Sequence, residues 1–229
     1  PKNTFNMYCN REPRFYISVV YNEQYHWGKG KTTNFFFNGE DGQPSHDNPS
    51  AGYLIRKHVD PTFVHSTNTG TYKSRQGILY RLAEAYLSYA ESALEYSMAK
   101  GTYDVDKADI VKYINKIRER AGIPQYGTSG LEIPTDPKEM RKLIRRERRV
   151  EMNCEGGLRW FDLRRWKEAE DVLDGNFYGM NMLAEKGNRD EFYKRVRYQT
   201  RKFKSYWWPI PQNEIDKNPN LKQMPGWMN

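Results

Sequence analysis

The chain has no apolar run long enough to cross a membrane as a helix. None of its charge-free apolar segments approaches the ~20 residues that a bilayer requires. Apolar residues make up only 37% of the 229 residues, and the mean hydropathy of −0.98 taken alone would favour disorder. Disordered chains, however, are poor in large rings, whereas 17 Tyr, 10 Phe and 6 Trp amount to 14% of this sequence. The composition therefore predicts a folded protein of one domain, or two at most.

Cysteine is equally scarce. Cys9 and Cys154 are the only two, and they form no metal-ligand spacing. Whether they pair cannot be deduced from sequence, so their redox state stays open. Cys154 falls on the apolar side of a predicted helix, which favours a buried free thiol. Pro1 is followed by no signal segment, so we expect a mature product or a fragment and infer nothing about export from this end.

Motifs of the well-known enzyme classes are also missing. The four histidines form no His-Glu-x-x-His pattern, and there is no Gly-x-Ser-x-Gly turn, phosphate-binding loop or dinucleotide fingerprint. The loop at 38–50 carries oxygen donors, but without the spacing of a dedicated calcium loop. Ordinary turn chemistry is the preferred explanation for these donors, which are Glu40, Asp41, Asp47 and Asn48. We therefore expect neither a metal nor a cofactor.

The net charge of +8 is concentrated in two segments. Residues 138–165 hold ten basic and five acidic side chains, and residues 189–204 hold seven and two, so each segment carries +5. A basic stripe is the electrostatic footprint of phosphate binding. No helix-turn-helix, RNA-recognition or zinc-finger signature accompanies the stripes, however. Solvated helix faces are the preferred explanation, and we expect no nucleic-acid partner.

The chain divides into three parts by pattern. Residues 1–70 are rich in strands and loops, with β-branched and aromatic runs that predict strands at 14–21 and 52–59. Residues 171–229 form a loop-rich tail with many aromatic residues and prolines. There we expect irregular structure with a short helix opening at Pro211, and we expect the rings of the tail to pack in a core.

Residues 71–170 form the helical part. Apolar residues at three- and four-residue steps predict helices at 79–101, 104–122, 137–155 and 158–166. Asp136 is a suitable cap for the third helix, with Pro137 at its first position. The first two helices meet through small alanines and form a hairpin like one tetratricopeptide unit. One such unit cannot bury both of its faces, so it needs neighbours.

Two glutamates lie on the apolar face of the third helix. A turn of 100° per residue places Glu147 and Glu151 within the arc formed by Met140, Leu143, Ile144, Val150 and Cys154. The same projection points the arginines of this helix outward. Buried carboxylates must be paired, hydrogen-bonded or protonated, because an isolated buried charge costs several kcal/mol.

Two explanations account for this acid pair. Side chains at i and i+4 start ~5–6 Å apart, and glycosidases use two carboxyls ~5–9.5 Å apart, so Glu147 and Glu151 could be catalytic. The preferred explanation is structural, with each glutamate bound by a guanidinium in a bidentate ion pair. The arginines expected to supply it follow shortly after the helix, and they are Arg159, Arg164 and Arg165.

Seven short motifs follow one another along the chain: EPRF at 12–15, GYLIRK at 52–57, YRLAEAY at 80–86, IRRERRVE at 144–151, WFDLRRW at 160–166, WPIP at 208–211 and NPNL at 218–221. In this order they resemble the C-terminal part of the SusD/RagB-type outer-membrane nutrient-binding proteins of Bacteroidetes. Each motif alone is weak, whereas the ordered set is specific and covers most of the chain. Glu12 stands where the family usually has Asp.

The resemblance implies a mainly α fold with irregular and short β segments, in which residues 1–229 are the C-terminal portion of a SusD-like α superhelix. Further helices and a lipidated cysteine would lie upstream. It implies a non-enzymatic surface lipoprotein of the outer membrane, held there only by that upstream lipid anchor. Such a protein captures glycans, or peptides in some relatives, and sits as a lid on a SusC-like TonB-dependent transporter. The Glu/Arg motif would then belong to the shared scaffold of the family.

The remaining question is where a glycan would bind. Pyranose faces are apolar and their edges polar, so exposed rings flanked by hydrogen-bonding groups suit them. The best local candidates are Gln24, Tyr25, His26, Trp27 and Asn34. Packing of these rings as the core of their loop explains them equally well. Three function classes stay open: a glycan- or peptide-binding protein, a glycoside hydrolase using Glu147 and Glu151, and a helical scaffold for other proteins.

Overall fold

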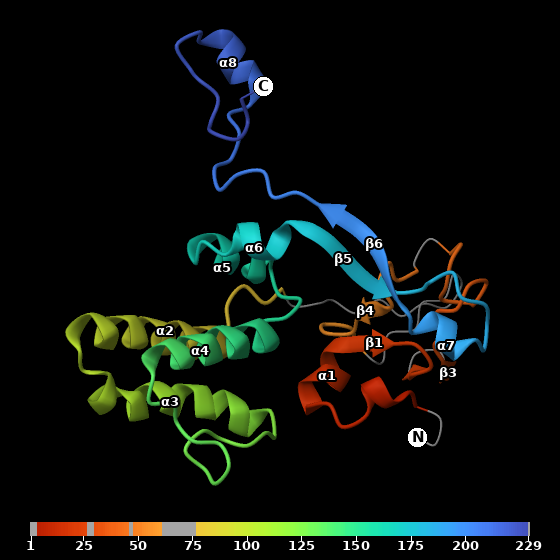
Figure 1. Cartoon of the computed structure of the whole chain (residues 1–229), viewed down its shortest axis with the longest axis horizontal. Coiled ribbons are helices and arrows are strands. Elements are labelled where there is room, and N and C mark those ends of the chain that lie inside the picture. Colours follow the sequence, from red (N-terminus) through yellow and green to blue (C-terminus); the bar gives the residue numbers. More distant parts are fainter. Residues whose placement is uncertain (1–3, 27–29, 46–47, 61–76, 229) are drawn as a thin grey trace.

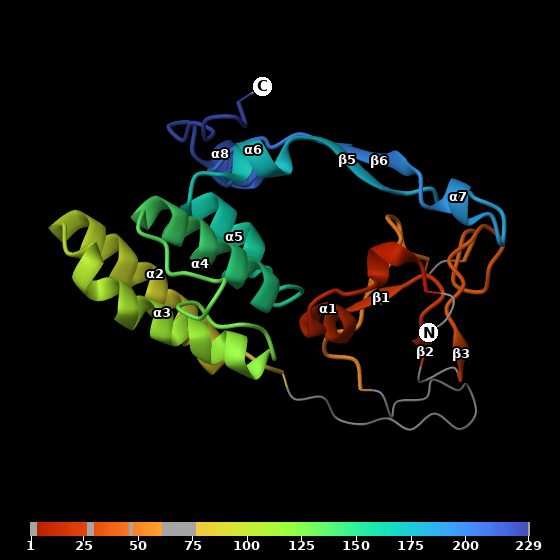
Figure 2. The same ribbon diagram turned by 60° about the horizontal axis from the view of Figure 1, so that its bottom comes forward.

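A computed structural model of the chain describes residues 4–26, 30–45, 48–60 and 77–228. The long helices gather on one side, the short strands on the other, and a two-stranded ribbon spans the two (Figures 1 and 2). The helices are α1 (Pro13–Ser18), α2 (Leu82–Lys100), α3 (Tyr103–Arg120), α4 (Pro137–Glu151), α5 (Leu158–Arg165), α6 (Ala169–Leu173), α7 (Arg189–Phe192) and α8 (Gln212–Lys217), with a 3-10 turn, η1, at Asn6–Tyr8. The strands are β1 (Val19–Tyr21), β2 (Tyr25–His26), β3 (Lys31–Thr32), β4 (Tyr53–Ile55), β5 (Gly175–Met180) and β6 (Arg195–Arg201).

The helical core is formed by α2, α3 and α4. The helices α2 and α3 pack as a hairpin, and α4 lies against α2. The hairpin turns at Gly101, whose φ of +70° is the left-handed conformation that ends helices. Asp136 caps α4 by accepting a hydrogen bond from the backbone N–H of Lys138 at 2.8 Å. The residues buried between these helices include Leu94, Ile110, Ile114, Met140 and Ile144.

A second core lies in the N-terminal part of the chain. Here β1 pairs antiparallel with β4, and β2 with β3. Segments distant in sequence meet in this core, which buries Tyr8, Val20, Tyr21, Phe35 and Phe36 together with Met180, Met182, Ala184 and Phe192. The N-terminal core is therefore completed by the chain that follows the helices.

The ribbon of β5 and β6 connects the two cores. Its strands pair antiparallel, with a register irregularity between Phe177 and Tyr178. At one end, Met180 enters the N-terminal core directly over Gly52, which has φ +90°. A Cβ at Gly52 would stand 2.5 Å from the Met180 sulfur. Glycine is thus required at this position both for its backbone conformation and for the close approach.

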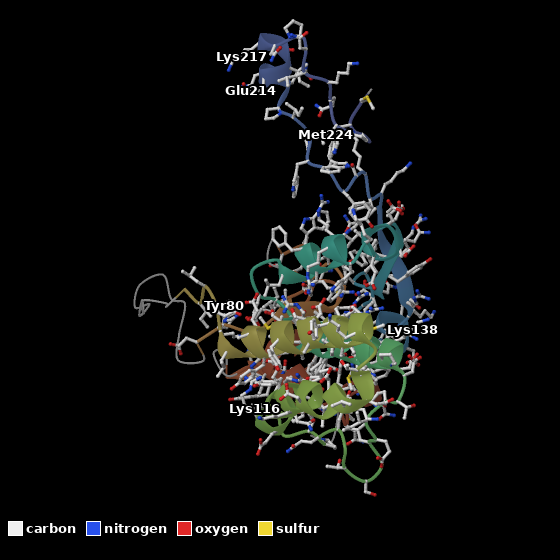
Figure 3. The ribbon with its side chains drawn as sticks, turned by 90° about the vertical axis from the view of Figure 1, so that its left-hand side faces the viewer. Tyr80, Lys116, Lys138, Glu214, Lys217 and Met224 are labelled. Carbon is white, nitrogen blue, oxygen red and sulfur yellow. The ribbon has the colours of Figure 1, made fainter. Side chains whose placement is uncertain are left out.

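The tail after β6 projects away from the rest of the molecule. Figure 3 shows Glu214 and Lys217 at the far end of this tail and Met224 partway along it, all well separated from the helices that carry Lys116 and Lys138. Within the tail, Gln223 forms two hydrogen bonds with the backbone of Ile210, both 2.8 Å long. The chain therefore folds back on itself beyond α8. No helix of the part of the chain that the structure describes is long and apolar enough to span a membrane.

The mainly α architecture with short β segments and a helical hairpin is confirmed. The predicted strand at 14–21 is wrong in its first half, which is the helix α1. Pro13 explains the difference, because its fixed φ suits the first position of a helix and outweighs the β-forming side chains that follow. The strand begins only at Val19.

Two burial expectations are also wrong. Cys154 is exposed, because α4 ends at Glu151 and the chain turns through a positive φ of 62° at Cys154. Trp207 and Trp208 were expected in a core, yet they are 58% and 64% exposed. The tail leaves the body of the molecule at this point, so the described segments cover these two rings only in part.

Candidate functional site

The acid pair of α4 lies on the buried side of the helix. Glu147 is 4% exposed and Glu151 is 3% exposed. They share this side with Met140 and Ile144, whose side chains belong to the helical core. The carboxylates face α1 across the space between the two cores. Charges at such depth require partners, and the partners decide what the pair can do.

Both oxygens of Glu147 accept hydrogen bonds from guanidinium groups. Nη1 of Arg14, on α1, donates to Oε1 at 2.6 Å, and Nη1 of Arg118, on α3, donates to Oε2 at 3.0 Å. Arg14 is itself held by Glu12, whose oxygens accept from its Nε at 2.8 Å and its Nη2 at 3.0 Å. Glu147 therefore joins α1, α3 and α4 through charge-assisted hydrogen bonds.

Glu151 is bound from several sides. Its Oε2 accepts from the same Arg14 Nη1 at 3.1 Å. Its Oε1 accepts from Arg81 Nη1 at 2.6 Å and from Arg120 Nη2. The ammonium of Lys57 donates to the backbone carbonyl of Glu151 at 2.7 Å. Cations from four separate segments thus converge on the C-terminal end of α4.

Glu155 extends this network beyond the end of α4. Arg81 binds its carboxylate twice, from Nε to Oε2 at 2.6 Å and from Nη2 to Oε1 at 2.7 Å. Lys57 forms an ion pair with the same carboxylate. Arg14 and Lys57 come from the N-terminal part, whereas Glu147 and Glu151 lie on α4 of the helical core and Glu155 follows it directly. The network is therefore a connection between the two cores.

The electrostatics of Glu151 do not suit a general acid. Burial alone would raise its pKa, but the hydrogen bond from Arg81 and the charge of Arg120 outweigh burial and hold the pKa below its ordinary value. A catalytic carboxylic acid needs a raised pKa instead. In addition, every oxygen of Glu147 and Glu151 already accepts from a guanidinium. The arrangement is that of a structural ion-pair network.

The arginines expected to bind the pair lie elsewhere. Arg165 binds both oxygens of Glu91 at 2.6 Å, and its Nε donates to Asp162 at 3.0 Å. Arg159 lies 5.8 Å from the centre of the Trp166 ring, and Arg164 stacks among the rings of the tail. The expectation failed because α5 packs toward α2 and the tail, while α1 and α3 face the glutamates.

Arg148 departs from the outward position that the helical projection gave it. It is 5% exposed, and its Nε donates to Asp162 at 2.7 Å. Asp162 also accepts from Arg165, and Glu91 accepts from Trp166 Nε1 at 2.6 Å. A second network therefore joins α2, α4 and α5, and the buried face of α4 is wider than its apolar residues indicate.

Two of the arginines that bind the acid pair were not predicted as its partners, although both lie in motifs noted in the sequence. Arg14 belongs to EPRF at 12–15 and Arg81 to YRLAEAY at 80–86. An arginine set among apolar and aromatic residues is itself a sign of a buried ion pair. Arg118, by contrast, looks like any basic residue in the last turn of an exposed helix. Only its position in space identifies it.

The proposed sugar-binding loop is only partly suited to a ligand. Tyr25 presents an exposed ring on β2. The Gln24 side chain, however, accepts a hydrogen bond from the backbone N–H of Tyr21 at 3.2 Å, and the Asn34 side-chain oxygen is buried. His26 lies on β2, and Trp27 lies outside the described residues. Of the five candidates, Tyr25 is therefore the one whose described side chain is exposed and could contact a ligand.

Two hollows occur near these features. The larger, of about 870 Å³, lies between α1, α3 and α4 and is lined partly by Phe15, Tyr126, Arg146 and Glu147. The smaller, of about 520 Å³, lies at the base of the tail beside α5. Within residues 4–26, 30–45, 48–60 and 77–228, no group of three or more His, Cys, Asp or Glu side chains is placed to hold a metal ion.

Comparison with known proteins gives a consistent result. A model of the SusD family matches residues 1–227. The SusD-like protein P2 of Formosa agariphila is 30% identical over 156 residues, which are 67% of this chain and 26% of that protein. The chain therefore spans about a quarter of the length of this curated relative.

Solved structures share the fold. The selenomethionine form of the protein BT4246 superimposes with a TM-score of 0.77 at 28% identity, over 98% of this chain and 39% of that chain. A SusD-like carbohydrate-binding protein of Bacteroides fragilis NCTC 9343, BF0978, gives a TM-score of 0.65 at 24% identity, over 95% of this chain and 42% of that chain. The second likeness concerns the fold alone.

Removing Glu147 should destabilise the protein strongly. In Glu147→Ala, the buried guanidiniums of Arg14 and Arg118 each lose a carboxylate, and breaking a buried pair costs about 3–5 kcal/mol. Urea denaturation followed by circular dichroism measures the free energy of unfolding. Glu139→Ala, which removes an exposed glutamate of the same helix, is the matched control and should change little. Equal losses in the two variants would contradict the structural role of Glu147.

Acid should weaken the fold in a defined range. The pKa values of Glu91, Glu151 and Glu155 are each lowered: burial alone would raise them, but hydrogen bonds from Arg165 to Glu91 and from Arg81 to Glu151 and Glu155 outweigh it. A lowered folded-state pKa contributes stability above the unfolded pKa of about 4.3, and this stability is lost as the pH falls through the folded pKa.

Urea unfolding midpoints between pH 7 and pH 3 test this expectation. The midpoint should stay nearly constant down to about pH 4.5 and then fall, because the unfolded carboxyls bind protons first. Glu151→Gln should start lower and show a shallower decline, since one of the linked groups is gone. A wild-type midpoint that rises on acidification below pH 5 would show that these carboxyls are not stabilised as ions.

Proposed function

The chain belongs to the SusD family, and from that premise we propose that it is part of a non-catalytic glycan-binding protein of the cell surface. Membership of this family, whose resemblance implies the capture of glycans, supports the choice of ligand. Fold alone does not determine function, so the proposal also needs support from the residues themselves.

The observation that favours binding over hydrolysis is that every carboxylate oxygen of Glu147 and Glu151 accepts a hydrogen bond from an arginine. A glycosidase needs one carboxyl that donates a proton and another that attacks or activates water. Here Arg14 bridges the two groups, and the remaining oxygens accept from Arg118, Arg81 and Arg120. No oxygen of the pair is free for a substrate, although Glu147 borders the larger hollow.

The finer parts of the proposal rest on the family. We propose that the protein acts at the outer membrane as a surface lipoprotein and passes its ligand to a SusC-like TonB-dependent transporter. A peptide ligand in place of a glycan is the alternative within the same family. The chain spans only part of its relatives, so these statements concern the protein to which the chain belongs.

Incubating the protein with a panel of oligosaccharides and a peptide mixture tests the function. We expect slower migration in affinity electrophoresis with at least one glycan and no new reducing ends after prolonged incubation. Release of reducing ends that is lost in Glu147→Gln would overturn the non-catalytic assignment. Retention by peptides without any by glycans would select the peptide alternative.

The loop containing Tyr25 and Trp27 is the local candidate for contact with a neutral glycan. Removing either ring, as in Tyr25→Ala or Trp27→Ala, should weaken retention of the bound glycan, because ring stacking on a pyranose face is lost. Tyr96→Ala, which removes an exposed ring of α2, is the matched control and should migrate like wild type. Unchanged migration of both loop variants would exclude this loop from the site.

A further inference from the structure

The smaller hollow at the base of the tail is built by three segments that lock together. Trp227 Nε1 donates to the carbonyl of Trp207 at 2.8 Å, and the Ser205 hydroxyl donates to the carbonyl of Pro225 at 2.7 Å. Gly226 has φ +85°, and a Cβ there would lie 2.8 Å from the carbonyl oxygen of Lys204. The returning chain can approach this closely only with glycine at 226. The hollow is therefore a defined feature of the tail and α5.

Aromatic rings form much of its wall. The ring centre of Trp160, on α5, lies 6.4 Å from that of Trp208 and 6.2 Å from that of Phe203. Trp207 and Trp208 also line the hollow, and more than half of each side chain is exposed. A volume of about 520 Å³ falls within the ~300–1,000 Å³ typical of small-molecule sites. Rings left open in this way offer apolar faces on which a sugar ring can stack.

The charge of the hollow is one-sided. Its lining includes four cations and no acidic residue, the cations being Arg164, Arg201, Lys202 and Lys204. Arg164 donates to the carbonyl of Ser205 at 3.0 Å and lies 5.0 Å from the Trp208 ring centre. Lys204 lies 4.2 Å from the centre of the Trp227 ring. Among the described residues none of these four cations forms an ion pair with a carboxylate.

This pattern contrasts with that of the arginines in the buried networks. Arg14, Arg81, Arg118, Arg148 and Arg165 each bind at least one carboxylate. Like charges gathered at one hollow repel one another, and an anion placed among them would be attracted by all of them. The basic segment at 189–204, which the buried networks leave largely unused, supplies three of the four cations. The hollow is thus complementary to a negatively charged ligand.

We propose that this hollow is a subsite for anionic saccharides, meaning sugars that carry sulfate or carboxylate groups. The proposal rests on the proposed function and names its ligand class. The rings of Trp160 and Trp208 would stack on the sugar, while Lys202, Lys204 and Arg164 would bind its anionic groups. A strand of nucleic acid is less well matched, because it needs a groove that follows several successive phosphates.

Binding measurements on the full chain test the proposal. The probes are a sulfated oligosaccharide, an oligogalacturonide and a neutral oligosaccharide of equal length, with a twelve-residue oligothymidylate as the nucleic acid. We expect the sulfated or the galacturonate probe to bind on the order of tenfold more tightly than the neutral one, a difference of about 1.4 kcal/mol. The comparison of these two probes separates sulfate from carboxylate recognition. Added salt should weaken the anionic binding.

Two variants locate the binding. Lys202→Gln/Lys204→Gln and Trp208→Ala should each lower the affinity for the anionic probe at least about tenfold, because each removes contacts of the kind that dominate binding. All three positions are exposed, so the melting temperature should stay unchanged. Lys112→Gln/Lys138→Gln, which removes two exposed lysines from α3 and α4, is the matched control and should bind like wild type.

The outcomes separate this proposal from the wider one. Binding of neutral glycans alone would leave the proposed function standing and overturn the anionic subsite. Loss of affinity in the control variant equal to that in Lys202→Gln/Lys204→Gln would also overturn it, since net charge would then explain the binding. Tighter binding of the oligothymidylate than of any saccharide would assign the hollow to nucleic acid. No glycan binding of any kind would contradict the proposed function itself.

Discussion

The bridge formed by Arg14 between Glu147 and Glu151 is the interaction on which the structure depends. Its Nη1 lies 2.6 Å from one carboxylate and 3.1 Å from the other, across more than 130 residues of sequence. A buried charge without its partner is strongly destabilising, so the N-terminal part and α4 stabilise each other. The planar guanidinium can serve both acids and Glu12 at once, which the single ammonium of lysine cannot do with the same geometry.

The bridge also indicates which residues stabilise the fold and which are available to bind a ligand. Glu147 and Glu151 are the carboxylates with the spacing of a catalytic pair. All of their oxygens accept hydrogen bonds from guanidiniums, and these bonds connect the two cores. The groups left open lie at the periphery, as rings and cations of the loop near Tyr25 and of the tail. This division directs attention to exposed side chains such as Tyr25 and Lys204 when ligands are considered.

Local features of the fold could be predicted from the sequence, and long-range ones could not. Asp136, Pro137 and Gly101 mark helix ends because caps and left-handed turns act within a few residues. The inward position of Glu147 also follows from helical geometry alone. Its partners could not be predicted, because Arg14 and Arg118 reach it through tertiary packing. The exposure of Trp207 could not be predicted for the same reason. The number of aromatic rings in a segment does not show whether another segment packs over them.

The late completion of the N-terminal core bears on how the chain folds during synthesis. Tyr8, Val20 and Phe35 share their core with Met180 and Phe192, so this core cannot form until the chain has been synthesised through Phe192. The buried apolar residues described for the helical core all lie between Ala83 and Met152. Its contacts are mostly local, which favours rapid folding. The helical segment can therefore fold first and serve as a template on which the flanking segments assemble.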